Sequence, residues 1–172
     1  MPTDNQNLSR ELHRIAVTVI IYTVDEKEKA GNGNFKYLVT KRAPFKKVHP
    51  NKWTVPGGGL TMDDYVNLPQ SHDNAGWYGA VEKGLQREIA EEVNVNIGDP
   101  KYLLNLTFIR PDNVPVLVLS YYAPFISGEV KLDAENVESR WVTLAEAKDL
   151  DLIAGIYEEI EEVDAILRKH QK

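Results

Sequence analysis

Three glutamates on one predicted helix are the residues in this sequence best suited to chemistry. Glu88, Glu91 and Glu92 stand in the run Arg87-Glu88-Ile89-Ala90-Glu91-Glu92, and residues three or four apart share one helix face. Like charges at this spacing repel by roughly 0.2–0.5 kcal/mol per pair, and the helix dipole disfavours anions near a C-terminal end. Because hard carboxylate oxygens suit Mg²⁺ or Mn²⁺, the run predicts a divalent-cation site. A solvated acidic face is the alternative.

A glycine-rich segment upstream favours the cation site. Gly57, Gly58 and Gly59 follow the strand-like residues Trp53–Val55, and glycine lets a backbone approach a ligand closely. We therefore expect these three glycines to bind substrate. A second acidic run, with Glu158, Glu159, Glu161 and Glu162, has no such motif beside it, and we expect it to be solvated surface.

Hydrophobic periodicity indicates which elements must position these residues. The helix that carries the glutamates is expected from about Ala75 to Val93, with Asp73 or Asn74 as its N-cap. We expect strands at residues 14–24, 35–42, 53–55, 101–109, 114–125 and 139–144, and further helices at 145–150 and 154–170. This order predicts an α/β fold, specifically an α/β/α sandwich with a mixed β-sheet between helices.

Length and composition set outer bounds. With 172 residues we expect a single domain over 1–172, with a core at about 14–150 and a C-terminal helix at about 154–169. The lack of cysteine excludes disulfides, thiolate metal sites and cysteine nucleophiles, and fits a cytoplasmic protein. The N-terminus is polar, and no apolar run approaches the roughly 18 residues of a membrane span.

Charge constrains the partners. A net charge of -6 argues against a broad nucleic-acid-binding surface. A polyanionic substrate would need metal ions or local basic clusters to offset the repulsion. One such cluster leads into the glycines, and one or two of its members are candidates for phosphate contact: Lys41, Arg42, Lys46, Lys47 and Lys52.

Together the two motifs resemble the Nudix box. Its pattern is Gly, five residues, Glu, seven residues, then Arg-Glu-apolar-x-Glu-Glu-x-Gly-apolar, and the segments that resemble it are WTVPGGGL (53–60) and REIAEEVNV (87–95). The later segment GEVKLDAENVESRWVTLAEA resembles the end of the family's domain. The resemblance covers most of residues 14–150 and implies a Mg²⁺-dependent, or Mn²⁺-dependent, phosphoanhydride hydrolase that acts on a small molecule.

The sequence departs from the pattern at three positions. Asp64 stands where the box has glutamate, and Asp73 and Glu82 are rivals for that role. Between Asp64 and Arg87 lie 22 residues in place of seven, an insertion of 15 residues. Asn94 replaces the late glycine, and asparagine is the next-best residue for a left-handed helix cap.

The resemblance also implies roles for individual residues. Glu88, Glu91 and Glu92, with a backbone carbonyl of Gly57 or Gly58, would hold the metal, and Arg87 would orient the carboxylates. For the general base the candidates are Glu88 in the helix and Glu135 or Glu138 in the later loop. We expect residues 65–79 of the insertion to lie over the site and set specificity. The alternative function is a Nudix-like domain that binds a nucleotide or a protein without hydrolysing anything.

Overall fold

Strand β1 (Arg14–Val24) lies at the centre of a mixed sheet in the computed structural model, which describes residues 12–24, 35–72 and 76–170. Its β-branched residues favour an extended backbone. It pairs in parallel with β7 (Pro115–Ser127) and antiparallel with β2 (Phe35–Arg42) and β4 (Gly57–Gly59). The glycine segment is therefore a short strand beside β1.

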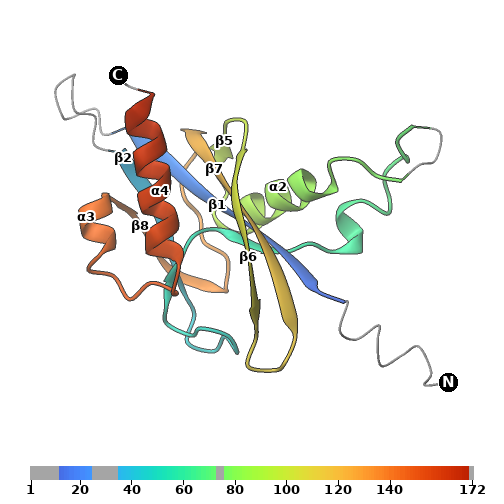
Figure 1. Cartoon of the computed structure of the whole chain (residues 1–172), viewed down its shortest axis with the longest axis horizontal. Helices are drawn as coiled ribbons and strands as arrows, with labels where there is room; N and C mark the ends of the chain where they lie inside the picture. The colour runs from blue at the N-terminus through green and yellow to red at the C-terminus, as the bar shows by residue number, and fades with distance from the viewer. Residues whose placement is uncertain (1–11, 25–34, 73–75, 171–172) are drawn as a thin grey trace.

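The other strands extend the sheet on both sides of this centre (Figure 1). β3 (Trp53–Thr54) and β8 (Asn136–Val142) pair with β2. β5 (Asn96–Ile97) and β6 (Lys101–Ile109) pair antiparallel with β7. The sequence predicted the longer strands, whereas β5 is too short to show a periodic pattern.

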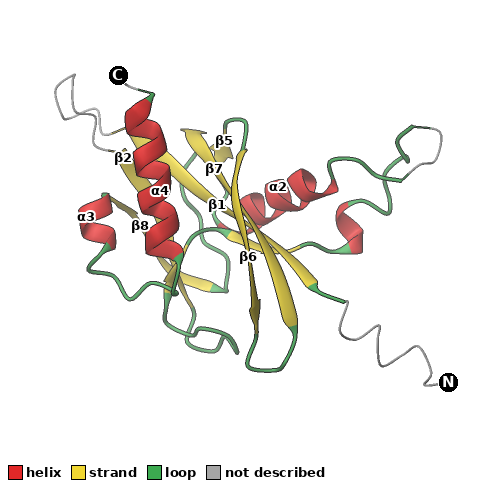
Figure 2. Ribbon diagram, in the orientation of Figure 1, coloured by secondary structure: helices red, strands yellow, loops and turns green. Residues whose placement is uncertain are grey.

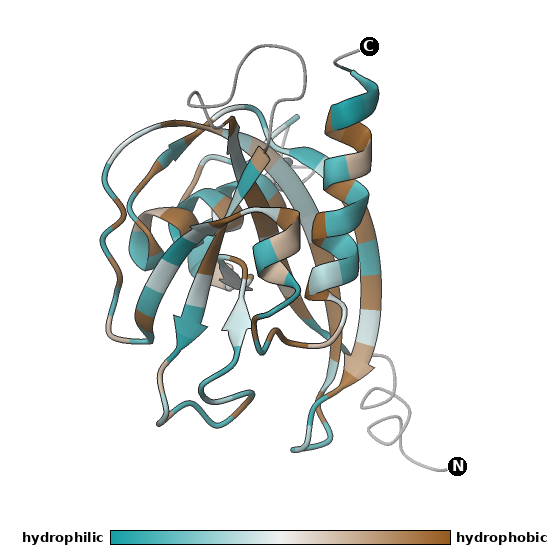
Figure 3. Ribbon diagram, turned by 90° about the vertical axis from the view of Figure 1, so that its left-hand side faces the viewer, coloured by the Kyte–Doolittle hydropathy of each residue, from teal (hydrophilic) through white to brown (hydrophobic). Residues whose placement is uncertain are grey.

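Helices cover both faces of the sheet, as Figures 1 and 2 show. Helix α2 (Ala80–Glu92) packs Leu85 and Ile89 against the face of β1 that carries Val17 and Val19. Helix α4 (Ile156–Lys169) packs on the opposite face, and the short helix α3 (Leu144–Ala147) adds Ala147 to the same cluster. Hydrophobic and hydrophilic residues both occur along α4 in Figure 3, as an amphipathic helix requires. The predicted α/β/α sandwich is confirmed.

Helix α2 differs from the prediction at its start. It begins at Ala80, five residues later than expected, after Gly79 with a φ of 73°. The expected caps Asp73 and Asn74 lie outside the described residues. At the other end Asn94 has a φ of 53° and donates its N–H to the Ile89 carbonyl at 2.8 Å, as predicted for a left-handed cap. Among the described residues no helix is long and apolar enough to cross a membrane.

Candidate active site

A cleft of about 790 Å³ brings together both halves of the predicted motif. Its walls come from the glycine strand β4, the C-terminal half of α2, the loop before β8 and the start of α4. The loop after β2, the first halves of β1 and β7 and the second half of β6 complete them. The predicted site residues that line it are Gly57, Gly58, Gly59, Glu88, Glu92 and Glu135. Its volume lies within the range of small-molecule sites in proteins.

The glycine strand and helix α2 touch at positions where only glycine fits. Gly57 has a φ of +148°, and a Cβ there would collide with the carbonyl oxygen of Val17. A Cβ on Gly58 would collide with the carboxylate of Glu88. Glu92 accepts a hydrogen bond from the Gly57 N–H at 2.8 Å. These contacts hold both carboxylates against the backbone of β4.

Burial perturbs both of these glutamates. It raises the pKa of Glu92 to about 7, with a smaller rise from Glu88, while the Gly57 N–H opposes the shift. Burial also raises the pKa of Glu88, and the guanidinium of Arg87 opposes it. A cation between the two carboxylates would favour their charged forms. Two partly desolvated carboxylates at this spacing are therefore suited to hold a cation.

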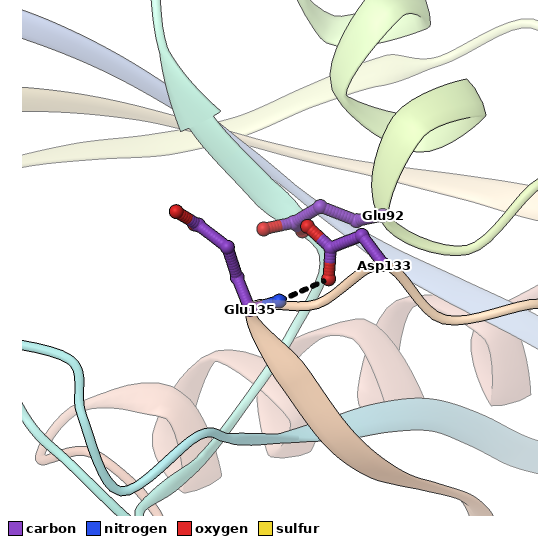
Figure 4. A group of neighbouring side chains, drawn as sticks. All are labelled: Glu92, Asp133 and Glu135. Atoms are coloured by element: carbon purple, nitrogen blue, oxygen red, sulfur yellow. Dashed lines mark hydrogen bonds between the residues drawn. The ribbon is translucent and has the colours of Figure 1, made fainter.

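Two further carboxylates join Glu92 from the loop before β8. Oxygen atoms of Glu92, Asp133 and Glu135 lie within 4.8 Å of one another, and Figure 4 shows that the first comes from α2 and the other two from this loop. Asp133 is fixed by the backbone N–H groups of Glu135 at 3.0 Å and Asn136 at 3.1 Å. This all-oxygen donor set fits a hard divalent cation. Asp133 was not among the residues predicted from the sequence, because nothing local in the sequence places it beside α2.

Arg87 organises the other side of α2. Its guanidinium donates to Asp64 at 2.5 and 3.2 Å, to the Gly59 carbonyl at 3.1 Å and to Glu91 at 3.0 Å. It also pairs with Glu88 at 3.0 Å. Neither Arg87 nor Glu91 is among the cleft-lining residues. The Arg87 Nη1 lies 3.0 Å from a carboxylate oxygen of both Glu88 and Glu91, and the orienting role of Arg87 and the metal-binding role of Glu91 stay predictions.

Of the three candidates for the box glutamate, Asp64 is the one that the structure brings to Arg87. It is buried, and the hydrogen bonds from Arg87 are the main reason that its pKa lies below the usual range. Of its rivals, Glu82 is exposed. Asp73 lies outside the described residues.

The described part of the insertion does not line the cleft. None of the described residues in 65–79 lines it, and in Figure 1 the segment extends beyond the N-terminal end of α2, away from α4. Tyr65 and Trp77 pack against each other at 5.4 Å, and Trp77 donates to the Leu68 carbonyl at 2.9 Å. The segment thus packs on itself, and the expectation that it covers the site is corrected.

The remaining predicted residues divide between the cleft and the surface. Glu138 pairs with Arg140 and does not line the cleft. Of the acidic run on α4, Glu158, Glu161 and Glu162 are exposed as expected, but Glu159 is buried and lines the cleft.

Basic side chains line the cleft together with the acids. Three come from the predicted cluster and two were missed, and together they are Arg42, Lys46, Lys47, Arg14 and Arg110. Lys46 forms an ion pair with Glu135, and Arg14 lies so close to Gly59 that a Cβ there would collide with it. Lys52 instead pairs with Asp151, and Lys41 lies 5.9 Å from the ring centroid of Trp53.

Solved structures share this fold across nearly the whole chain. The MutT protein from Methanosarcina mazei Go1 is 21% identical, with a TM-score of 0.63 over 93% of this chain and 96% of that one. A C. elegans Ap4A hydrolase binary complex gives 18% identity and 0.64, over 91% and 98%. The NUDIX domain of Shewanella oneidensis NrtR complexed with ADP ribose gives 15% and 0.66, over 97% and 99%. At these identities the likeness shows the fold alone.

The family is shown by the sequence itself. No curated protein matches the chain, but the model of the NUDIX domain matches residues 12–163. That range contains the glycine strand, the REIAEE helix and the loop with Asp133 and Glu135. The enzyme class predicted from the box, a Nudix-type pyrophosphohydrolase, is supported by this match. The chain belongs to the NUDIX domain family.

Proposed function

We propose that this protein hydrolyses a phosphoanhydride bond in a nucleoside diphosphate-linked substrate, with Mg²⁺ or Mn²⁺ as its cation. Nucleoside triphosphates, ADP-ribose, dinucleoside polyphosphates and nucleotide sugars share the diphosphate that such a site would bind. The observation that carries the proposal is one cleft in which Glu88, Glu92 and Glu135 face five basic side chains. The lack of cysteine leads us to propose a cytoplasmic location.

The carboxylates would hold the cation. Glu88 and Glu92, one helical turn apart, lie against β4, and Asp133 would add a further oxygen ligand beside Glu92. A divalent cation bound there neutralises negative charge on the phosphate oxygens and lowers the pKa of water. In this proposal Arg87 and Asp64 fix the position of α2 relative to β4 and touch neither cation nor substrate.

The basic residues would bind the phosphates. Arg14 beside Gly59 and Arg110 on the turn between β6 and β7 present guanidinium groups that suit phosphate oxygens. The chain as a whole carries a charge of -6, so a polyanion would bind only where local cations outweigh the general repulsion. This cleft supplies both kinds of cation, side chains and metal.

Glu135 is the general base that the geometry favours. It lines the cleft, lies in the cluster with Glu92, and is held by Lys46. Proton transfer requires a base within hydrogen-bond reach of the attacking water. Glu138 points to Arg140 instead, and Glu88 lies against Gly58, where it is better placed to bind the cation.

The test is a product-release assay on the four substrate classes with Mg²⁺, with Mn²⁺ and with EDTA. We expect at least one class to be cleaved, only when a divalent cation is present. Full activity after exhaustive chelation would refute the role given to the cation. Tight nucleotide binding without product in any condition would favour the alternative, a binding domain that does not hydrolyse.

A further inference from the structure

Glu159 of helix α4 is a buried acid in the cleft wall that the proposed hydrolysis does not use. Its side chain is 5% exposed, and its Oε2 has no hydrogen-bond partner among the described residues. None of the described lysines and arginines forms an ion pair with it. The other buried acid on α4, Asp164, accepts hydrogen bonds from Tyr37 at 2.8 Å and Arg168 at 2.5 Å. Leaving a buried acceptor unpaired is costly, so an orphan in a cleft wall points to a ligand.

Two hydroxyl groups, one buried and one partly buried, connect Glu159 with the glycine end of the cleft. Ser120 hydrogen bonds to the Glu159 carboxylate, and its Oγ lies 3.0 Å from the Oγ1 of Thr18. Thr18 on β1 is in turn the register partner of Gly57 on β4. From Gly57 to Ser120 is a step of two strand spacings, which amounts to about 10 Å. This separation suits a nucleoside whose phosphates lie at the glycines and whose base lies near α4.

 Apolar side chains line the cleft together with Glu159. Ile153 and Ile156 at the start of α4 and Val118 on β7 line the same cleft. Ligand sites commonly combine such apolar walls with a few placed polar groups that fix orientation. The terminal torsion of a glutamate is broad, so either carboxylate oxygen of Glu159 can turn toward a ligand.

We propose that Glu159, supported by Ser120 and Thr18, binds the base of the substrate and selects guanine. A carboxylate only accepts hydrogen bonds, and guanine presents two adjacent donors, N1–H and the N2 amino group, on one edge. Adenine places an acceptor, N1, beside its amino group, and this acceptor would face the carboxylate. The inference rests on the proposed function for the position of the phosphates, and it narrows the substrate class to guanine nucleotides.

Binding of non-hydrolysable nucleotides tests the inference separately from catalysis. The full chain with Mg²⁺ is titrated calorimetrically with the α,β-methylene analogues of guanosine and adenosine diphosphate. We expect the guanosine analogue to bind at least about tenfold more tightly, the scale of one well-formed pair of hydrogen bonds to a base. Glu159→Gln should reverse the order, because an amide offers one donor and one acceptor and so pairs with adenine. Glu158→Gln, on the exposed side of the same helix, is the matched control and should keep the wild-type order.

The base-site inference and the proposed hydrolysis can fail independently in these experiments. Equal affinity of the wild-type protein for both analogues, or an adenosine preference, would overturn the inference. So would an equal loss for both analogues in Glu159→Gln, which is what a purely structural role predicts. A guanosine preference that Glu159→Gln reverses, in a protein that cleaves no substrate, would support the base site and refute the proposed hydrolysis. Cleavage of diphosphates without any base preference would do the opposite.

Discussion

Asp64 and Arg87 form a two-point ion pair across 23 sequence positions, with distances of 2.5 Å from Nε to Oδ1 and 3.2 Å from Nη2 to Oδ2. The same Arg87 Nη2 donates to the Gly59 carbonyl at 3.1 Å. Asp64 also accepts from the Thr61 backbone N–H at 2.8 Å. The pair thus ties the end of the glycine strand to α2, although the insertion separates the two segments in sequence.

Breaking this pair should loosen the site without removing any group that contacts the cation. We expect Asp64→Asn to lower the stability by about 1–3 kcal/mol, the scale of a hydrogen bond to a charged group, and to lower turnover as well. Chemical denaturation and steady-state kinetics measure the two effects. Asp63→Asn, at the exposed neighbouring position, is the control. Unchanged stability in Asp64→Asn would show that the pair does not brace the helix.

Glu88→Gln and Glu92→Gln should each reduce turnover by roughly two orders of magnitude or more, as the loss of a key electrostatic element does. The fold should be retained, because each change removes a charge from a group of like charges. Kinetics and circular dichroism with and without Mg²⁺ check both expectations. A marked drop in melting temperature in the absence of metal would mean that these glutamates are structural.

The pKa of Glu92 predicts a pH-dependent stability in metal-free protein. The folded value of about 7 exceeds the ordinary value of 4.5, so the folded state binds more protons between these values. The free energy of unfolding should therefore fall as the pH rises from about 4.5 to 7, by at most about 3 kcal/mol. In Glu92→Gln the free energy of unfolding should not fall over this range. The variant should therefore be more stable than the wild type, by the largest amount above pH 7. Urea denaturation in EDTA measures it, with the exposed Glu161→Gln as the control. Parallel curves for Glu92→Gln and wild type would contradict the assignment.

Mutation should have different effects on kcat at Glu135 and at Glu138, two candidates for the general base from the sequence. Glu135 lines the cleft, whereas Glu138 pairs with Arg140 outside it. Glu135→Gln should lower kcat by about 10²–10⁴-fold, the usual contribution of a general base, and Glu138→Gln should lower it far less. The pH dependence of kcat in both variants completes the test. A larger loss for Glu138→Gln would reject Glu135 as the base.

Shortening the insertion should leave selectivity unchanged. Its described residues do not line the cleft, so replacing residues 66–74 with a short Gly-Ser link should change kcat/KM by the same factor for every substrate. The panel of four substrate classes provides the measurement. A change in the ranking of substrates would indicate that the segment reaches the ligand after all.

The sequence by itself determined the family, the layered α/β fold and most element boundaries. The one-sided apolar stripe of α4 and the runs of apolar and β-branched residues in β1 and β2 indicate these elements because buried positions exclude polar side chains. The clustered charges of Glu88 and Glu92 stood out for the same reason, since their repulsion follows from helical spacing alone.

Tertiary structure decided which residues share the cleft. Asp133 and Glu159 look like ordinary surface acids in the sequence, yet one lies within 4.8 Å of Glu92 and Glu135 and the other is buried in the cleft wall. Asp64 could be separated from its rivals only when Arg87 was seen to hold it. Contacts between segments far apart in the chain depend on sheet order and helix packing, and no local pattern of residues encodes them.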